Sequence, residues 1–185
     1  MEALTIEKPT EKIEKNDYFV SEPPPKTEKK RVLVFGTFDI VHPAHLKFLQ
    51  KARFAANCPD CELVVVVARD SSIKRIKGHY PIFQEEDRLK LISGLRLVDF
   101  ARLGNEGKEH FNVILEVAPD YIILGYDQLQ NETPLQNFIQ EKNIDVQIFR
   151  LPKFESGDLS SSSEVREKVL NMINEKKKAE TRNKE

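Results

Sequence analysis

Two histidines three positions apart, His42 and His45, follow closely on a short apolar run and a glycine. The run, residues 32–35, is β-branched and apolar without alternation, which predicts a buried parallel strand that ends at Gly36. A helix is predicted over residues 43–56, because proline suits a first helical turn and apolar residues recur at helical spacing. Free backbone N–H groups, the positive end of the helix dipole and two imidazoles would then meet at one point. These features predict a phosphate-binding site.

Further polar residues follow the ends of later apolar runs. Asp127 comes directly after the apolar run 121–125, and Lys77 lies in the basic cluster 74–77. A run of serines, residues 160–163, precedes an apolar periodicity, so one serine caps a helix and Ser161-x-x-Glu164 can form a capping box. Hydroxyl and N–H groups at such a helix start favour an anion, although capping alone also explains the serines.

The elements that must position these groups alternate along the chain. Strand-like runs cover residues 32–38, 63–69, 98–103, 121–125 and 146–151, and helical patterns cover 43–56, 85–95, 108–117 and 134–142. This alternation predicts an α/β fold, a parallel five-stranded sheet with helices on both faces, right-handed crossovers and ligands at the carboxyl ends of the strands. We expect one domain over residues 31–173. Residues 1–30 read as a disordered, charged and proline-rich arm, and residues 174–185 as a solvated, frayed tail.

Composition favours a single globular core and restricts the partners. The 185 residues carry 29 basic and 30 acidic side chains and a formal net charge of −1, so we expect no general nucleic-acid-binding surface. The chain has no apolar run of membrane-spanning length and no apolar signal-peptide core near its start, so we expect no membrane partner and a cytoplasmic location.

Cys58 and Cys61 form a C-x-x-C pair between the first predicted helix and the second predicted strand. Such a pair can bind zinc or cycle as a redox couple. No second C-x-x-C or C-x-x-H supplies further zinc ligands, and a thioredoxin-like pair would open a helix rather than close one. We therefore predict a turn with two reduced thiols, with a metal or redox site as the alternative.

Short motifs between residues 31 and 173 together carry a family resemblance. They are Gly36-Thr37-Phe38-Asp39, His42-Pro43-Ala44-His45, Arg69-Asp70-Ser71, the basic segment 74–78, Glu85-x-x-Arg88-Leu89, Gly125-Tyr126-Asp127-Gln128 and the segment 161–166. In order and spacing they resemble the HxGH nucleotidyltransferases, which are cytidylyltransferase-like and belong to the Rossmann-like HUP class. Within that family the combination is most similar to the archaeal FAD synthetases.

The resemblance implies a transfer of AMP from ATP to FMN, which gives FAD and pyrophosphate. By resemblance, His42, His45 and Lys77 are the catalytic residues. The nucleotide would be held by Gly36, Thr37, Phe38, His42, His45, Gly125, Asp127, Ser161, Ser162 and Ser163. The acceptor phosphate would be met by Lys77, Arg88, Asp39 and Lys153. Mg²⁺ or another divalent cation is expected to arrive with ATP, with no protein ligand assigned. A homodimer is also implied.

Several alternatives stay open. Lys77 could be a solvated loop charge, and Arg88 could serve a core ion pair in place of the acceptor. Cytidylyl transfer to glycerol 3-phosphate, or to a similar phosphorylated alcohol, is a second enzymatic hypothesis. Ala44 stands where the family motif has glycine, so a nucleotide-binding sensor without turnover is a third hypothesis.

Overall fold

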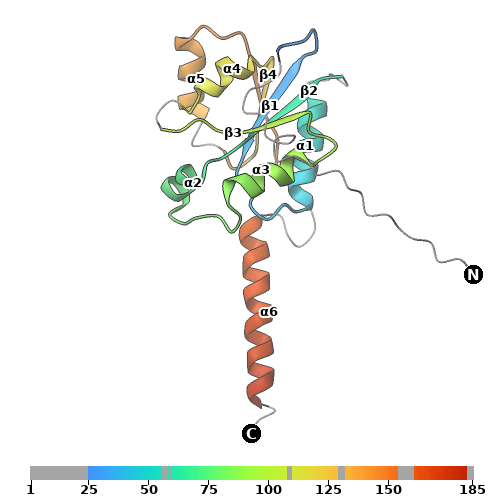
Figure 1. The fold of residues 1–185 in the computed structure, drawn as a ribbon, viewed down its shortest axis with the longest axis vertical. Helices are drawn as coiled ribbons and strands as arrows, with labels where there is room; N and C mark the ends of the chain where they lie inside the picture. Colours follow the sequence, from blue (N-terminus) through green and yellow to red (C-terminus); the bar gives the residue numbers. More distant parts are fainter. Residues whose placement is uncertain are drawn as a thin grey trace, which may run out of the picture.

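The computed structural model describes residues 25–55, 58, 60–107, 110–128, 132–153 and 161–182. At its centre is one five-stranded sheet with the strand order β3-β2-β1-β4-β5, in which every pairing is parallel (Figure 1). The strands are β1 (Arg31–Gly36), β2 (Glu62–Val67), β3 (Phe100–Leu103), β4 (Tyr121–Leu124) and β5 (Gln147–Arg150). The predicted α/β fold is confirmed.

The strand order indicates where a ligand-binding crevice lies. The chain builds outward from β1 through β2 to β3, and then returns to the other side of β1 for β4 and β5. The order therefore reverses between β1 and β4, and ligands of open α/β sheets bind at the carboxyl ends of strands at such a point.

Helices cover both faces of the sheet. They are α1 (Pro43–Ala55), α2 (Asp70–Lys77), α3 (Glu85–Ser93), α4 (Asn112–Val117), α5 (Glu132–Glu141) and α6 (Ser162–Arg182). Alternate residues of the strands point to opposite faces. Val32 and Val34 of β1 join a cluster with α1 and α3, whereas Leu33 joins a cluster with α4 and α5. Because both faces of the central strands β1, β2 and β4 are buried, these strands read as largely continuous apolar runs.

Helix α2 was not predicted. The basic segment 74–78 was interpreted as a loop, but the structure shows a helix that ends at Gly78, whose φ is 77° and whose N–H donates to the Lys74 carbonyl at 3.0 Å. Ile73 and Ile76 are the apolar residues of this eight-residue helix and Ile76 is exposed, so the apolar pattern was too short to predict a helix.

Helix α6 also differs from the prediction. It continues to Arg182, so the boundary expected at residue 173 falls inside the helix, and residues 174–177 of the predicted solvated tail are exposed. Figure 1 shows α6 extending away from the sheet, and the side chains of Val169 and Met172 are accordingly exposed. The arm predicted over residues 1–30 lies, up to residue 24, outside the described residues.

The two cysteines are joined. A disulfide links Cys58 and Cys61, whose Cα atoms are 5.4 Å apart, so the prediction of two reduced thiols is wrong. The Cys61 N–H donates to the Cys58 carbonyl at 3.2 Å, and this tight turn brings the two sulfurs together. The pair stands just before β2, at the amino edge of the sheet.

The described residues contain neither a membrane-spanning helix nor a cluster of metal-binding side chains. None of the helices there has the length and apolar character that a bilayer crossing requires. That part of the chain also holds no group of three or more histidine, cysteine or acidic side chains arranged to bind a metal ion.

Candidate active site

A cavity of about 650 Å³ opens at the predicted crevice. Its wall includes every residue that the sequence assigned to the nucleotide, namely Gly36, Thr37, Phe38, His42, His45, Gly125, Asp127, Ser161, Ser162 and Ser163. Ala44 and Lys77 line it as well. Residues separated by more than a hundred positions in the sequence therefore meet around one space.

The two histidines are stacked at the start of α1. Their ring centroids are 3.8 Å apart, and the His45 N–H donates to the His42 carbonyl at 2.9 Å as the helix begins. The His42 backbone N–H points at His45 Nδ1 from 3.4 Å. Because Nδ1 accepts this bond, the proton of the neutral ring lies on Nε2, which is then a free donor.

Burial keeps both rings neutral. Burial lowers the pKa of His45 to about 3, and the neighbouring His42 and Lys77 act in the same direction. Burial also lowers the pKa of His42, against the opposite effect of Glu164. His42 is only 7% exposed, and neither of its ring nitrogens has a hydrogen-bond partner among the described residues. Buried polar atoms rarely stay unpaired, so the His42 ring is prepared for a ligand.

The loop before the histidines is tightly packed. A Cβ atom on Gly36 would lie 2.6 Å from the Phe38 ring, so only glycine fits beneath that ring. Phe38 and Ile40 both have positive φ values, 51° and 52°, which are uncommon for residues with side chains. The Phe38 ring centroid is 5.3 Å from that of His45. Phe38 therefore packs against His45 and forms part of the cavity wall.

Asp39 is outside the cavity wall, so the structure does not support its predicted contact with the acceptor phosphate. Its carboxylate is buried, accepts the N–H groups of Ile82 at 3.0 Å and Phe83 at 3.1 Å, and pairs with Arg166. Burial disfavours the charged form, but these donors outweigh it, and the pKa of Asp39 lies below its usual range. The Ser162 hydroxyl also donates to the Asp39 carbonyl. The Asp39 carboxylate, whose oxygens already accept hydrogen bonds, joins the segments around the site. Its negative charge would repel a phosphate.

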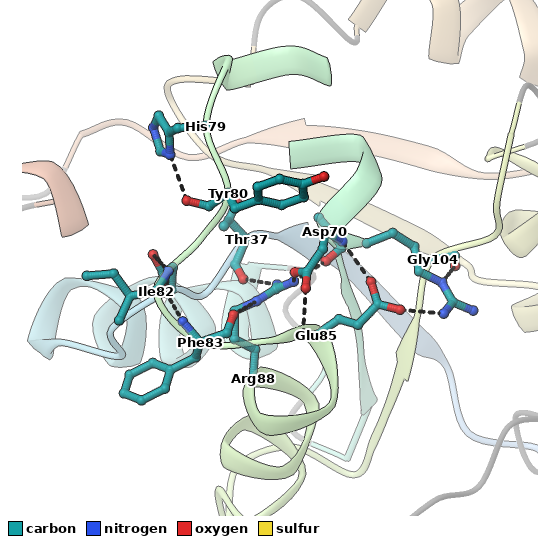
Figure 2. Close-up of polar contacts among 12 residues, drawn as sticks. Thr37, Asp70, His79, Tyr80, Ile82, Phe83, Glu85, Arg88 and Gly104 are labelled. Carbon is teal, nitrogen blue, oxygen red and sulfur yellow. Dashed lines mark hydrogen bonds and ion pairs between the residues drawn. The ribbon is translucent and has the colours of Figure 1, made fainter. Parts of the chain in front are cut away.

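Arg88 is also turned inward, so the structure does not support its predicted contact with the acceptor phosphate. Its side chain is fully buried and outside the cavity wall. Figure 2 shows it between Thr37, Phe83 and Asp70. The guanidinium donates to the carbonyls of Phe83 at 3.0 Å and Thr37 at 2.6 Å, and to the Asp70 carboxylate at 2.6 Å. These contacts match the core ion pair that the sequence left open.

The two lysines assigned to the acceptor phosphate differ in position. Lys77 lines the cavity from the end of α2. Lys153 is not in the cavity wall, and its Nζ lies 5.7 Å from the centroid of the Tyr126 ring, which is in the wall. Lys77 is therefore the better placed of the two to reach a bound phosphate.

The capping box at α6 is confirmed. The Glu164 N–H donates to the Ser161 hydroxyl at 3.2 Å, and the Ser161 N–H donates back to the Glu164 carboxylate at 3.1 Å. The reciprocal bonds orient the serines of the first turn. This turn lies against the cavity, so hydroxyl groups and the positive end of the α6 dipole meet the same space as the histidines.

Sequence reasoning missed one wall of the cavity. An apolar and aromatic surface is formed by Val66, His110, Phe111, Leu124 and Leu135. The rings of His110 and Phe111 lie 4.1 Å apart between centroids. Nothing in the sequence separates these residues from ordinary core positions, because their spacing matches that of buried strand and helix residues.

Comparisons with known proteins were made for the whole chain. A family model described as cytidylyltransferase-like matches residues 33–168. The FAD synthase of Thermoplasma volcanium is 45% identical over 146 residues, which cover 79% of this chain and 98% of that protein. The FAD synthase of Korarchaeum cryptofilum is 43% identical over 137 residues, which cover 74% of this chain and 90% of that protein.

Solved structures show the same fold. One, described as a lipopolysaccharide core biosynthesis protein from Thermoplasma volcanium, is 46% identical with a TM-score of 0.61, and the match covers 68% of this chain and 98% of that one. A pantoate-beta-alanine ligase from Francisella tularensis is 16% identical with a TM-score of 0.52, covering 75% of this chain and 65% of that one. The second likeness concerns the fold alone.

Proposed function

The chain belongs to the cytidylyltransferase-like family, and from this premise we propose that it is an FMN adenylyltransferase, which makes FAD and pyrophosphate from FMN and ATP. The choice of FMN as the acceptor rests on one observation: the chain has 45% and 43% sequence identity with two proteins named FAD synthase. The cavity supports nucleotidyl transfer, because it joins an anion-binding helix start, two imidazoles and a lysine.

The chemistry needs no covalent enzyme intermediate. An oxygen of the FMN phosphate attacks the α-phosphorus of ATP, the new P–O bond forms in line with the bond that breaks, and pyrophosphate leaves with the bonding electrons. Catalysis then depends on positioning and on neutralising the charge that moves to the leaving group. His45 Nε2–H would donate to a phosphate oxygen, and the unpartnered His42 ring would take a second one.

Other cavity residues would bind the remaining parts of the nucleotide. Lys77 would supply positive charge to the triphosphate or to the FMN phosphate, and Ser161, Ser162 and Ser163 would bind the β- and γ-phosphates. Thr37 would add a hydroxyl at the end of β1. Asp127 would lie near the ribose.

The apolar wall suits the acceptor. The isoalloxazine ring of FMN is flat and largely apolar, and it would gain from packing against aromatic side chains. Phe111 and Leu135 supply such a surface in the cavity. A glycerol phosphate has no group that would use this wall.

A divalent cation, Mg²⁺ by preference, is part of the proposal. Asp127 is the single carboxylate among the described residues of the cavity wall. Mg²⁺ keeps several waters and is commonly held by one or two carboxylates together with substrate phosphates, so Asp127 fits as a protein ligand. The ion would neutralise the triphosphate charge.

The location and the assembly remain proposals. We place the protein in the cytoplasm because its substrates would be phosphorylated small molecules. The resemblance to the family favours a homodimer, which light scattering of the purified protein would test.

The test of the function is a substrate panel. Pyrophosphate release is measured with ATP plus FMN and with CTP plus glycerol 3-phosphate. The proposal expects turnover with the first pair. Turnover with the second pair alone would identify a cytidylyltransferase, and nucleotide binding without any turnover would support a sensor.

Histidine variants test the mechanism. His42→Ala and His45→Ala should each lower kcat by about two orders of magnitude and weaken nucleotide affinity less, because their donors matter most as charge develops. His79→Ala is the matched control, since His79 is exposed and outside the cavity wall. Wild-type turnover in either cavity variant would remove the histidines from the mechanism.

A further inference from the structure

Helix α2 carries Lys77 but has little apolar attachment to the rest of the protein. Ile73 is its buried residue, and the side chains from Lys74 to Lys77 are exposed. A short helix with one apolar anchor takes its orientation from whatever holds its ends. The end that carries Lys77 lies at the cavity, so the first turn must supply that hold.

The first turn is tied to α3 by reciprocal bonds. The Asp70 N–H donates to the Glu85 carboxylate at 2.7 Å, and the Glu85 N–H donates to the Asp70 carboxylate at 3.3 Å. Each carboxylate thus satisfies a free N–H group at the start of the other helix. Figure 2 shows the two side chains facing one another between the helix starts.

Two arginines connect this pair to the sheet. Arg88 binds Asp70 and also donates to the carbonyls of Thr37 at 2.6 Å and Ala68 at 2.7 Å, which directly follow β1 and β2. Arg69 binds Glu85 at 2.7 Å and donates to the carbonyl of Gly104 at 2.8 Å, directly after β3. The four charges balance, and the carboxyl ends of three strands are joined to the start of α2.

Because Lys77 lies at the far end of α2 from this cluster, a small change in the cluster would displace Lys77 at the cavity. With a rise of 1.5 Å per residue, the seven steps from Asp70 to Lys77 span about 10 Å, so a tilt of about 10° at the first turn would move the Lys77 backbone by about 2 Å. A displacement of that size is enough to remove a hydrogen bond to a phosphate.

We propose that Asp70 is a positioning residue, which orients α2 through Glu85 and Arg88 and so places Lys77 at the cavity. The inference rests on the proposed role of Lys77 toward the nucleotide. Asp70 itself touches no substrate in this account, because it is outside the cavity wall.

The experiment is a double-mutant cycle on nucleotide affinity. The probe is the α,β-methylene analogue of ATP with Mg²⁺, and its Kd is measured by calorimetry for the wild type, Asp70→Asn, Lys77→Ala and the double variant. Asp70→Asn and Lys77→Ala should each raise Kd by about tenfold, because the contact of Lys77 with the phosphate is displaced in the first variant and removed in the second. In the Lys77→Ala background, Asp70→Asn should add less than about twofold, because the contact it positions is already gone.

Matched variants separate positioning from folding. Asp87→Asn removes an exposed carboxylate of α3 that pairs only with exposed Lys90 in the contacts described, and it should leave Kd unchanged. Glu85→Ala removes the acceptor for the Asp70 N–H, keeps the pair of Asp70 with Arg88, and replaces Asp70→Asn if that variant does not fold. In the Asp70 and Glu85 variants, the KM for ATP should rise while kcat changes less.

The outcomes are distinct. Additive effects of Asp70→Asn and Lys77→Ala would overturn the inference, as would an unchanged Kd in Lys77→Ala. Because the probe reports binding alone, a positive cycle would stand even if the wild type failed to convert FMN. Such a failure would count against the proposed reaction and not against the positioning of Lys77.

Discussion

The ring nitrogens of His42 and His45 have different surroundings although the residues are three positions apart. His45 Nδ1 is engaged by the His42 backbone, so only Nε2 is available to a ligand. Both ring nitrogens of His42 lack a hydrogen-bond partner in the part of the chain that the structure describes. The pair therefore offers one donor of defined tautomer and one ring that can adapt to the ligand.

The pKa of His45 predicts a pH dependence of stability. The ordinary value is 6.5, and burial lowers it to about 3 in the folded protein. Between pH 6.5 and pH 3, the His45 side chain is protonated in the unfolded chain but stays neutral in the folded protein. The free energy of unfolding should therefore fall as the pH drops from 6.5 toward 3, by up to about 1.4 kcal/mol per pH unit for one proton.

Urea unfolding at pH 7 and pH 5 measures this effect. His45→Gln should reduce the loss of stability between the two pH values, whereas the exposed control His79→Gln should keep the wild-type loss. An equal loss in His45→Gln and in the wild type would contradict the assignment of a neutral, buried ring.

Ala44 tests whether the nucleotide passes over the turn between the histidines. Its side chain lines the cavity. Ala44→Gly should preserve or improve nucleotide affinity and cost about 0.5–1 kcal/mol of stability, because glycine loses more backbone entropy in a helix. Ala44→Leu should block binding by steric overlap. If the leucine variant binds and turns over normally, the nucleotide does not lie over this turn.

At the scale of elements, the start of α6 is held by a local capping box and by contacts with a segment distant in sequence. Its capping box is formed within four consecutive residues, yet its first turn also binds the loop after β1, through Ser162 and Arg166 to Asp39. The helix start is therefore held both by its own sequence and by the loop that carries the histidines.

Removing the capping box should loosen the first turn of α6. Glu164→Ala loses the acceptor for the Ser161 N–H, and a lost cap costs about 1 kcal/mol. Amide hydrogen exchange in the first turn should speed up about fivefold. Glu164→Gln keeps a side-chain acceptor and is the control. Unchanged exchange in Glu164→Ala would mean that other contacts hold this helix start.

At the scale of the molecule, the two ends of the strands serve different purposes. The cavity lies at the carboxyl ends of the strands, and a buried cation lies at their amino ends. Arg31 is 1% exposed and binds the Glu62 carboxylate at 2.9 Å and the carbonyls of Val117 at 3.0 Å and Pro25 at 2.9 Å. It thereby joins β1, β2, the end of α4 and the segment before β1.

Arg31→Met should therefore change stability without changing catalysis. Loss of the buried guanidinium leaves Glu62 and two carbonyls without their donor, which should cost about 3 kcal/mol in the free energy of unfolding. Urea unfolding measures that loss, and steady-state kinetics should give wild-type KM and kcat for the folded protein. A change in KM for ATP would show that the two ends of the strands are coupled.

The sequence alone determined those features that are encoded within a few neighbouring residues. Apolar runs without alternation predicted β1, β2 and β4, because strands buried on both faces need no polar face. The helix start at Pro43 and the capping box at Ser161 were predicted because caps are made by residues three or four positions apart. The convergence of the nucleotide residues followed from strand ends that share one edge.

Only the tertiary structure decided the roles of groups whose partners are distant in sequence. Arg88 and Asp39 were predicted to meet an anion, but long-range packing gave each of them buried partners from other segments. Helix α2 escaped prediction because bonds to Glu85 and Arg88 hold it in place of an apolar stripe. A charged side chain has the same sequence signature whether it faces solvent, a ligand or a buried partner, and its surroundings form only when the chain folds.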